Sequence, residues 1–164
     1  MKIELKNIKY SEFASQETYC YEAALYIDGK KAGVVSNEGH GGADYFHGDN
    51  EAYRKAESWL AENGNPLQMT DGEMLPEDVE MRCADLVSKW LRMREVKKIL
   101  RRISYLALDK NGKIGLYQLP AKHKPTAENL AQVQKASWWD DTREMISGLP
   151  EDKALNKLLI AGIL

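Results

Sequence analysis

The segment from residue 18 to residue 36 constrains the fold of this chain more than any other part of the sequence. Between residues 18 and 27 apolar side chains recur at every second position, which is the period of a strand with one buried face. Asp28 and Gly29 follow directly, and this pair favours the positive φ angles of a two-residue hairpin turn. Residues 31–36 then return as a further strand. We therefore predict an antiparallel hairpin whose inward face carries Tyr19, Tyr21, Ala23, Leu25 and Ile27.

An earlier strand extends this hairpin to a three-stranded meander. Ile3 and Leu5 alternate with charged residues, and Ile8 and Tyr10 continue the alternation displaced by one position. Because a displacement of one residue is what a β-bulge produces, we expect a bulge near Asn7.

Two helices are predicted after the meander. Asp49 and Asn50 can cap the start of the first helix, whose apolar side chains share one face and which Gly64 ends. Pro76, followed by two acids, marks the start of the second helix. The apolar stripe of the second helix continues as far as Met93 and then disappears. We therefore expect this helix to end or kink between residues 94 and 100.

The second half of the chain adds a further hairpin and two more helical patterns. Strands are predicted at 103–108 and 114–119, and helices at 126–136 and 151–160. The expected fold class is therefore α+β, with an antiparallel sheet of about five strands, an N-terminal meander plus this later hairpin, covered by three to five helices.

The chain length suits one domain. We expect a single α+β domain spanning residues 1–164. Turn-rich residues between positions 63 and 76 could join two sub-halves, 1–64 and 76–164.

Composition places the chain among ordinary globular proteins. Of its 164 residues, 43% are hydrophobic and 29% are charged, which excludes disordered and collagen-like chains. Two cysteines, Cys20 and Cys83, form no disulfide framework and favour a reducing compartment. The first residues lack the apolar core of a signal peptide, and the apolar stretch 158–164 is too short to cross a bilayer. We therefore expect a cytoplasmic protein with no membrane partner.

The parts of the chain follow one another in a suggestive order. The chain contains, in sequence, KIELKNIKYSEFASQET, a hairpin with DGK, SNEGHGGADYF, a helix, a basic helix end, a hairpin and a closing GLPEDKAL. This order resembles that of short uncharacterised proteins common in bacteriophages and integrated elements, and the resemblance covers most of the chain. The group has no assigned activity, so the resemblance implies no site residues. It implies an accessory protein that binds a host component.

The glycine-rich loop at residues 37–44 is the first candidate site. Its glycines permit a backbone whose successive N–H groups could bind an anion, and its place between a strand and a helix suits phosphate. The loop lacks the lysine and the spacing of nucleotide-binding motifs. The alternative is a glycine-rich turn at the edge of the sheet. The candidate ligand-binding residues are Gly39, His40, Gly41, Gly42 and Asp44.

The sequence contains no recognisable catalytic or metal-binding arrangement. His40, Asp44 and His47 are weak candidates for zinc or iron ligands, but their spacing matches no known motif. Cys20 and Cys83 occupy positions typical of a core. Motifs of serine hydrolases, zinc proteases and β-lactamases are absent. We therefore predict no metal and no cofactor, and a non-catalytic function is favoured over an enzyme.

The second candidate site is the basic patch at residues 89–102. Seven basic residues and one acid give this segment a net charge of +6, whereas the whole chain carries −2 and the remainder therefore −8. Cations stabilise a helix C-terminus, which accounts for part of the pattern. The remaining cations fit a solvated face, an acidic protein surface or nucleic acid. Trp90 and Tyr105 could lie beside them as stacking surfaces, although Trp90 falls on the apolar stripe and fits the core better. The basic patch consists of Lys89, Arg92, Arg94, Lys97, Lys98, Arg101 and Arg102.

The third candidate site lies near the C-terminus. Trp138 and Trp139 are adjacent, so one ring can be buried while the other is partly exposed. Exposed aromatic rings anchor protein interfaces, although both rings could instead pack on the sheet. The apolar residues 158–164 are expected to dock on this domain or on a second copy of the chain, so self-association is a further expectation.

Three function hypotheses follow. The leading one is a small accessory protein that binds a host macromolecule, most simply a protein, without catalysis, with inhibition of that partner as one possible effect. The first alternative is a nucleic-acid-binding protein that uses the basic patch. The second is a phosphate-binding or small-molecule-binding enzyme built on the glycine-rich loop.

Overall fold

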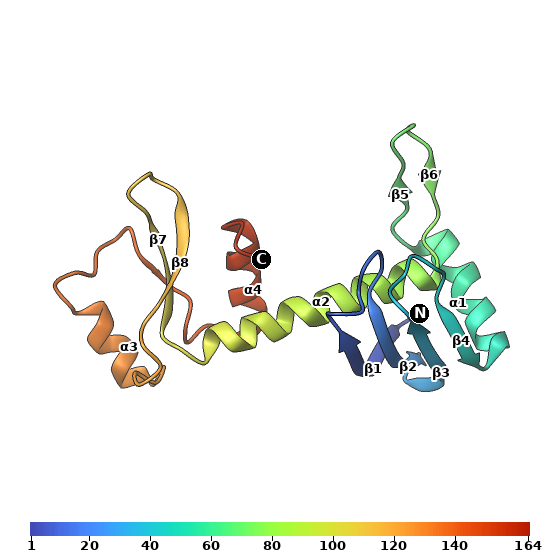
Figure 1. Cartoon of the computed structure of the whole chain (residues 1–164), viewed down its shortest axis with the longest axis horizontal. Helices are drawn as coiled ribbons and strands as arrows, with labels where there is room; N and C mark the ends of the chain where they lie inside the picture. Colours follow the sequence, from blue (N-terminus) through green and yellow to red (C-terminus); the bar gives the residue numbers. More distant parts are fainter. The chain divides into compact units, whose positions relative to one another are not determined.

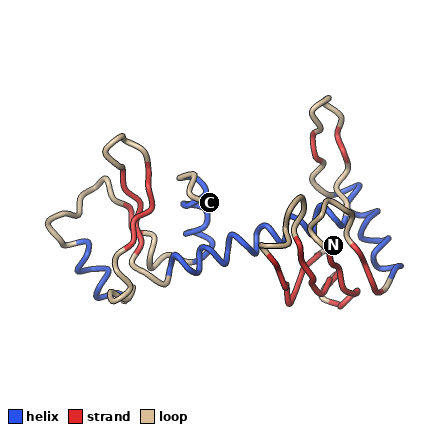
Figure 2. The backbone as a smooth tube through the Cα atoms, viewed as in Figure 1, coloured by secondary structure: helices blue, strands red, loops and turns tan.

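The computed structural model describes all 164 residues and divides them into two compact units. Unit 1 comprises Met1–Lys89 and unit 2 comprises Trp90–Leu164. Each unit contains helices and antiparallel strands, as Figure 2 shows, which confirms the predicted α+β class. The division falls within a helix, whereas the turn-rich residues 63–76 lie wholly inside unit 1.

Unit 1 is built on a four-stranded antiparallel sheet in the order β1-β2-β3-β4 (Figure 1). The strands are β1 (Ile3–Ser11), β2 (Cys20–Ile27), β3 (Lys30–Asn37) and β4 (Tyr45–Gly48). The register between β1 and β2 shifts after Lys6, and Asn7 has a φ of 54°, which confirms the predicted bulge. The inward face of β2 is buried from Tyr21 to Ile27. Strand β4 escaped prediction because its four residues are too few to show a period.

Two helices complete the core of unit 1. The helix α1 (Asn50–Asn63) begins at Asp49, whose carboxylate accepts hydrogen bonds from two backbone N–H groups at 3.0 Å. On its inner side the Tyr53 ring lies 4.5 Å from the ring of Phe46 on β4, measured between centroids. The helix α2 (Val79–Leu100) contributes its first turns. The fully buried helical side chains of unit 1 are Ala56, Leu60, Val79, Cys83 and Val87.

Unit 1 also contains a short hairpin, between α1 and α2 in the sequence, that the sequence pattern did not predict (Figure 1). The strand β5 (Leu67–Gln68) pairs with β6 (Met74–Leu75), and every one of these side chains is exposed. The turn between them is held by Asp71, whose carboxylate accepts a hydrogen bond from the backbone N–H of Glu73 at 3.0 Å. A strand of two residues is below the length at which alternation can be recognised.

The helix α2 continues without interruption to Leu100, so the loss of its apolar stripe after Met93 marks no kink. The cause is a change in what the helix buries. Up to Val87 the buried side chains belong to unit 1, whereas Val96 is buried in the core of unit 2. Val96 follows Val87 by nine positions, which is half a turn out of phase on an α-helix. The helix ends at Leu100, the last residue of the range 94–100 in which its end was predicted.

Unit 2 combines a three-stranded sheet, in the order β8-β7-β9, with two short helices. These elements are β7 (Ser104–Leu108), β8 (Ile114–Gln118), α3 (Ala127–Gln134), β9 (Glu144–Met145) and α4 (Glu151–Ile160). Leu106, Ile146 and Leu158 form its core with Val96 of α2, and the C-terminal Ile163 and Leu164 pack against that core. The apolar C-terminus therefore docks on its own unit, although Ile160 remains 79% exposed. No helix in the structure has both the length and the apolar composition that a membrane span requires.

Candidate functional site

Four aromatic rings gather on one face of the unit 2 sheet, and we call them the aromatic surface: Tyr105, Tyr117, Trp138 and Trp139. Tyr105 and Tyr117 are directly opposite each other on β7 and β8, and their rings stack with centroids 5.7 Å apart. Both tryptophans lie in the segment after α3, at centroid distances of 5.8 and 5.4 Å from Tyr105. Trp138 is 42% exposed and Tyr117 is 38% exposed, whereas Trp139 is half-buried. The predicted difference between the adjacent tryptophans is therefore observed.

Strand alternation determines which face these rings occupy. Leu106 and Leu116 are opposite each other and pack in the core of unit 2. Tyr105 and Tyr117 are displaced by one position along β7 and β8, so they project from the other face of the sheet. The two tryptophans cover part of that second face. Tyr117 was missed as a member of this surface, although the turn at residues 109–113 sets the register that pairs it with Tyr105.

Two clefts flank the aromatic surface. One has a volume of about 230 Å³ and includes Tyr105, Tyr117, Lys110 and Arg143 in its walls. The other, of about 310 Å³, borders Trp138 and α3. The Arg143 guanidinium lies 5.9 Å from the centre of the Trp138 ring and pairs with Asp140. Exposed aromatic anchors beside clefts, with arginine nearby, are the typical centre of a protein interface.

The residues of the basic patch lie on α2 and in the turn that follows it, and all seven of their side chains are exposed. Arg94, Lys97, Lys98 and Arg101 fall within roughly 100° around the helix axis. Lys98 is paired with Glu95 at 2.6 Å and Lys97 with Glu151 at 3.5 Å. The patch residues without a carboxylate within 4.0 Å are Lys89, Arg92, Arg94, Arg101 and Arg102.

The two units carry opposite charges. Unit 1 has nine basic and seventeen acidic residues, a net charge of −8. Unit 2 has fourteen basic and eight acidic residues, a net charge of +6. Six of the seven patch residues belong to unit 2, so the patch supplies most of that positive charge.

The structure does not combine the basic patch with the aromatic surface. Tyr105 stacks on Tyr117, on the sheet face opposite the core that contains Val96 of α2. Trp90 is half-buried, and the Arg94 guanidinium lies 4.7 Å from the centre of its ring. The expectation that Tyr105 lies beside the basic patch is therefore wrong, because strand alternation turns its ring to the other face of the sheet.

The glycine-rich loop is a turn in which the N–H groups of Gly39 and Gly41 are used within unit 1. The N–H of Gly39 donates to the Asn37 side chain at 2.8 Å, and the N–H of Gly41 donates to the Thr18 hydroxyl at 3.3 Å. The Gly39 carbonyl in turn accepts from the three successive N–H groups of residues 16–18. Gly39 and Gly41 both have φ angles in the left-handed region. These contacts match the alternative interpretation, a glycine-rich turn at the sheet edge.

Asp44 closes this loop onto the sheet. Its carboxylate accepts hydrogen bonds from the Tyr21 hydroxyl and from the Asn37 amide. Burial raises the pKa of Asp44 above its ordinary value. His40 and His47 are exposed, and no group of three or more His, Cys, Asp or Glu side chains is arranged to hold a metal ion. Asp44 thus acts as an anchor between loop and sheet.

The buried Cys83 is poorly placed for nucleophilic chemistry. Cys83 is fully buried, and burial raises the pKa of its thiol to about 12. A thiol with that pKa is protonated near neutral pH and is therefore a poor nucleophile. Cys20 lies half-buried on β2 and takes part in no disulfide.

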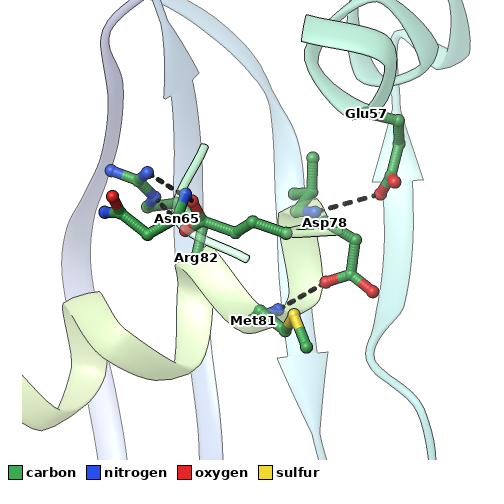
Figure 3. A network of polar contacts seen from close by, with 7 residues as sticks. Glu57, Asn65, Asp78, Met81 and Arg82 are labelled. Carbon is green, nitrogen blue, oxygen red and sulfur yellow. Dashed lines mark hydrogen bonds and ion pairs between the residues drawn. The ribbon is translucent and has the colours of Figure 1, made fainter. Parts of the chain in front are cut away.

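A buried ion pair that the sequence analysis did not anticipate lies at the start of α2 (Figure 3). Glu77, which is 4% exposed, accepts two hydrogen bonds from the Arg82 guanidinium, at 2.6 and 2.8 Å, and a third from the backbone N–H of Asn65 at 2.7 Å. The contact to Asn65 closes the base of the β5–β6 hairpin. Asp78 caps the helix by accepting from the Met81 N–H at 2.7 Å, so α2 begins at Val79, three residues after the predicted start at Pro76.

The ion pair also explains Gly64, the predicted end of α1. Gly64 has a φ of −80°, so no left-handed conformation requires glycine there. A Cβ at this position would instead lie 2.4 Å from a carboxylate oxygen of Glu77 and 2.6 Å from the Leu60 carbonyl oxygen. The glycine is needed because Glu77 approaches the backbone closely.

Comparisons of the chain with protein-family models, with curated proteins and with solved structures find no match. The resemblance to bacteriophage-type proteins therefore stays a prediction.

Proposed function

We propose that the chain is a non-catalytic binding protein that holds a macromolecular partner, a host protein, on the aromatic surface of unit 2. The observation that carries the proposal is the cluster of four rings in which Trp138 and Tyr117 remain substantially exposed beside two clefts. Large exposed rings that are already held by their neighbours lose little conformational freedom on binding, which is why such residues dominate interface energetics.

A capture experiment tests this proposal. The intact protein is immobilised, exposed to a nuclease-treated bacterial lysate and washed, and the retained proteins are identified. Replacing Trp138 by Ala together with Tyr117 by Ser should lower the recovery of the specific partner at least about tenfold, since hot-spot residues contribute roughly 2 kcal/mol or more each. Phe13→Ser is the matched control, because Phe13 is 96% exposed in unit 1. Equal recovery by both variants would rule out the aromatic surface as the binding site.

A second candidate function is nucleic-acid binding through the basic patch. The specific observation is that four of the six patch cations in unit 2 have no carboxylate within 4.0 Å, in a unit with a net charge of +6. Retention on DNA or RNA should then weaken steeply as salt is raised, because binding releases counterions from the phosphates. Replacing Arg94, Lys97, Lys98 and Arg101 by Ala should abolish it, whereas replacing Lys30 and Lys31 on β3 should not. Absence of retention at low salt would eliminate this candidate.

A further inference from the structure

We propose that unit 1 contains a binding site for an organic cation, an ammonium or guanidinium group, in a cleft between the segment that joins β1 to β2 and the helix α2. The cleft has a volume of about 520 Å³. We call it the tyrosine cleft, and its walls are formed by Tyr10, Ser15, Gln16, Glu17, Thr18, Tyr19 and Ala84. This site is separate from the aromatic surface and does not depend on the function proposed for it.

Two tyrosine rings form the apolar part of the cleft wall. Tyr10 and Tyr19 meet edge to face, with centroids 6.2 Å apart, and both are half-buried. Rings held at a steep angle to each other present a π face and a ring edge side by side. A cation bound against such a face is attracted by the ring quadrupole.

The polar groups of the cleft favour a cation over an anion. The three successive backbone N–H groups of residues 16–18, which would otherwise form an anion-binding nest, all point to the Gly39 carbonyl oxygen, at 2.9 to 3.4 Å. No lysine, arginine or histidine contributes to the wall. The cleft therefore offers an anion neither a positive charge nor this set of backbone donors.

The serine and threonine hydroxyl groups of the wall are also engaged within the fold. Ser15 donates to the Ser11 carbonyl at 2.7 Å and accepts from the Cys20 N–H at 2.8 Å. Thr18 donates to Asn37 at 2.7 Å and accepts from the Gly41 N–H at 3.3 Å. These contacts leave the Glu17 carboxylate, the Gln16 amide and the two tyrosine hydroxyls as the polar side-chain groups that can meet a ligand.

Glu17 is the single charged side chain in the wall, and it has no cation within 4.0 Å. The glycine-rich loop lies against it, because a Cβ on Gly41 would come within 2.2 Å of a Glu17 carboxylate oxygen. Unit 1 as a whole carries a net charge of −8, which raises the local concentration of cations. An unpaired carboxylate beside two tyrosine rings is the combination that recognises an organic cation.

Titration by nuclear magnetic resonance tests the site on the full-length protein. Tetramethylammonium is the probe, neopentyl alcohol is the neutral probe of similar shape, and sodium phosphate is the anionic probe. We expect tetramethylammonium to shift the signals of residues 15–19 and of the Tyr10 and Tyr19 rings saturably. The affinity of the neutral probe should be at least about fivefold lower. Stronger shifts from phosphate, or no saturable shift from the cation, would overturn the proposal.

Two variants connect the response to the proposed groups. Glu17→Gln keeps the shape of the side chain and should weaken cation binding about fivefold, and Tyr19→Leu should weaken it by a similar factor. Glu62→Gln on α1 is the matched control, because Glu62 is an exposed acid of the same unit outside the cleft. Unchanged affinity in Glu17→Gln, with an unchanged circular dichroism spectrum, would contradict the proposal.

The cation can come from a free amine or from a side chain of another protein. n-Butylguanidinium and a capped Ala-Arg-Ala peptide each carry one guanidinium group and a single positive charge, so the two arms separate these sources. Tighter binding of the peptide identifies an arginine of a protein as the ligand, and tighter binding of n-butylguanidinium identifies a free small-molecule cation. Binding of neither guanidinium compound would restrict the site to ammonium groups and contradict the wider ligand class.

Discussion

Replacing Glu77 by Gln should destabilise unit 1 by about 2–3 kcal/mol at pH 7. The side chain is 4% exposed and accepts three hydrogen bonds, two of them from Arg82. Breaking a fully buried ion pair costs roughly 3–5 kcal/mol. Arg82 is 30% exposed, so water can solvate part of the guanidinium after the change, which lowers the expected cost. Glutamine retains an acceptor for the Asn65 N–H, which lowers it further.

The effect should depend on pH in a defined direction. The hydrogen bonds from Arg82 hold the pKa of Glu77 below its ordinary value of 4.5. Because the folded-state pKa lies below the unfolded one, Glu77 contributes its full stability above pH 4.5 and loses it as the pH falls through the folded value. Glutamine does not titrate. The difference between wild type and Glu77→Gln should therefore narrow below pH 4.5.

Urea unfolding followed by circular dichroism, with hydrogen exchange of β2 as the reporter of unit 1, measures both effects. The control is Glu51→Gln, which breaks the exposed pair with Lys55 and should change stability by less than about 0.5 kcal/mol. If Glu77→Gln proves no more destabilising than this control, or equally destabilising at pH 3 and pH 7, the reasoning from burial is refuted.

Three further predictions concern the loop, the sheet and the C-terminus. Gly39→Ala should destabilise unit 1 by more than about 2 kcal/mol in thermal unfolding, because its Cβ would lie 2.1 Å from the Ala14 carbonyl oxygen, whereas Gly42→Ala, with open space around it, should change stability by less than about 0.5 kcal/mol. In urea titrations, Tyr21→Phe should lower the free energy of unfolding by about 1–2 kcal/mol at pH 7 and by a smaller amount at pH 3. Removing the hydrogen bond raises the pKa of the buried Asp44 further. A carboxyl group whose folded-state pKa is raised lowers stability as the pH rises, so the loss is larger at pH 7. Ile163 and Leu164 pack on the core of their own unit, so removing them should lower the melting temperature of unit 2. The oligomeric state measured by light scattering should stay the same. A change in oligomeric state with an unchanged melting temperature would contradict this prediction.

Local sequence patterns predicted those elements of the fold that bury one face along their whole length. The period of β2, the turn at Asp28 and the bulge near Asn7 depend on neighbouring residues alone, and all three are observed. The helix α2 was harder, because its buried face changes between Val87 and Val96. A pattern analysis that assumes one face for the whole helix interprets that change as an ending.

The candidate sites were predicted in composition but not in arrangement. The sequence identified Trp138, Trp139 and the basic patch, yet it could not show that strand alternation places Tyr105 with the tryptophans and away from the cations. The pair Glu77 and Arg82 lies five positions apart across the start of a helix, so no periodicity marks it. The tyrosine cleft joins residues 10–19 to Ala84, and such long-range proximity follows only from packing.

Site-specific photo-crosslinking tests the proposed binding surface most directly. A photoreactive phenylalanine analogue is placed at position 138 in one protein and at position 13 in another, and each is irradiated in nuclease-treated bacterial lysate. The account predicts a defined protein adduct from position 138 that is absent from position 13, although the latter side chain is 96% exposed. The same adduct from both positions, or from position 13 alone, would contradict the claim that the aromatic surface binds the partner.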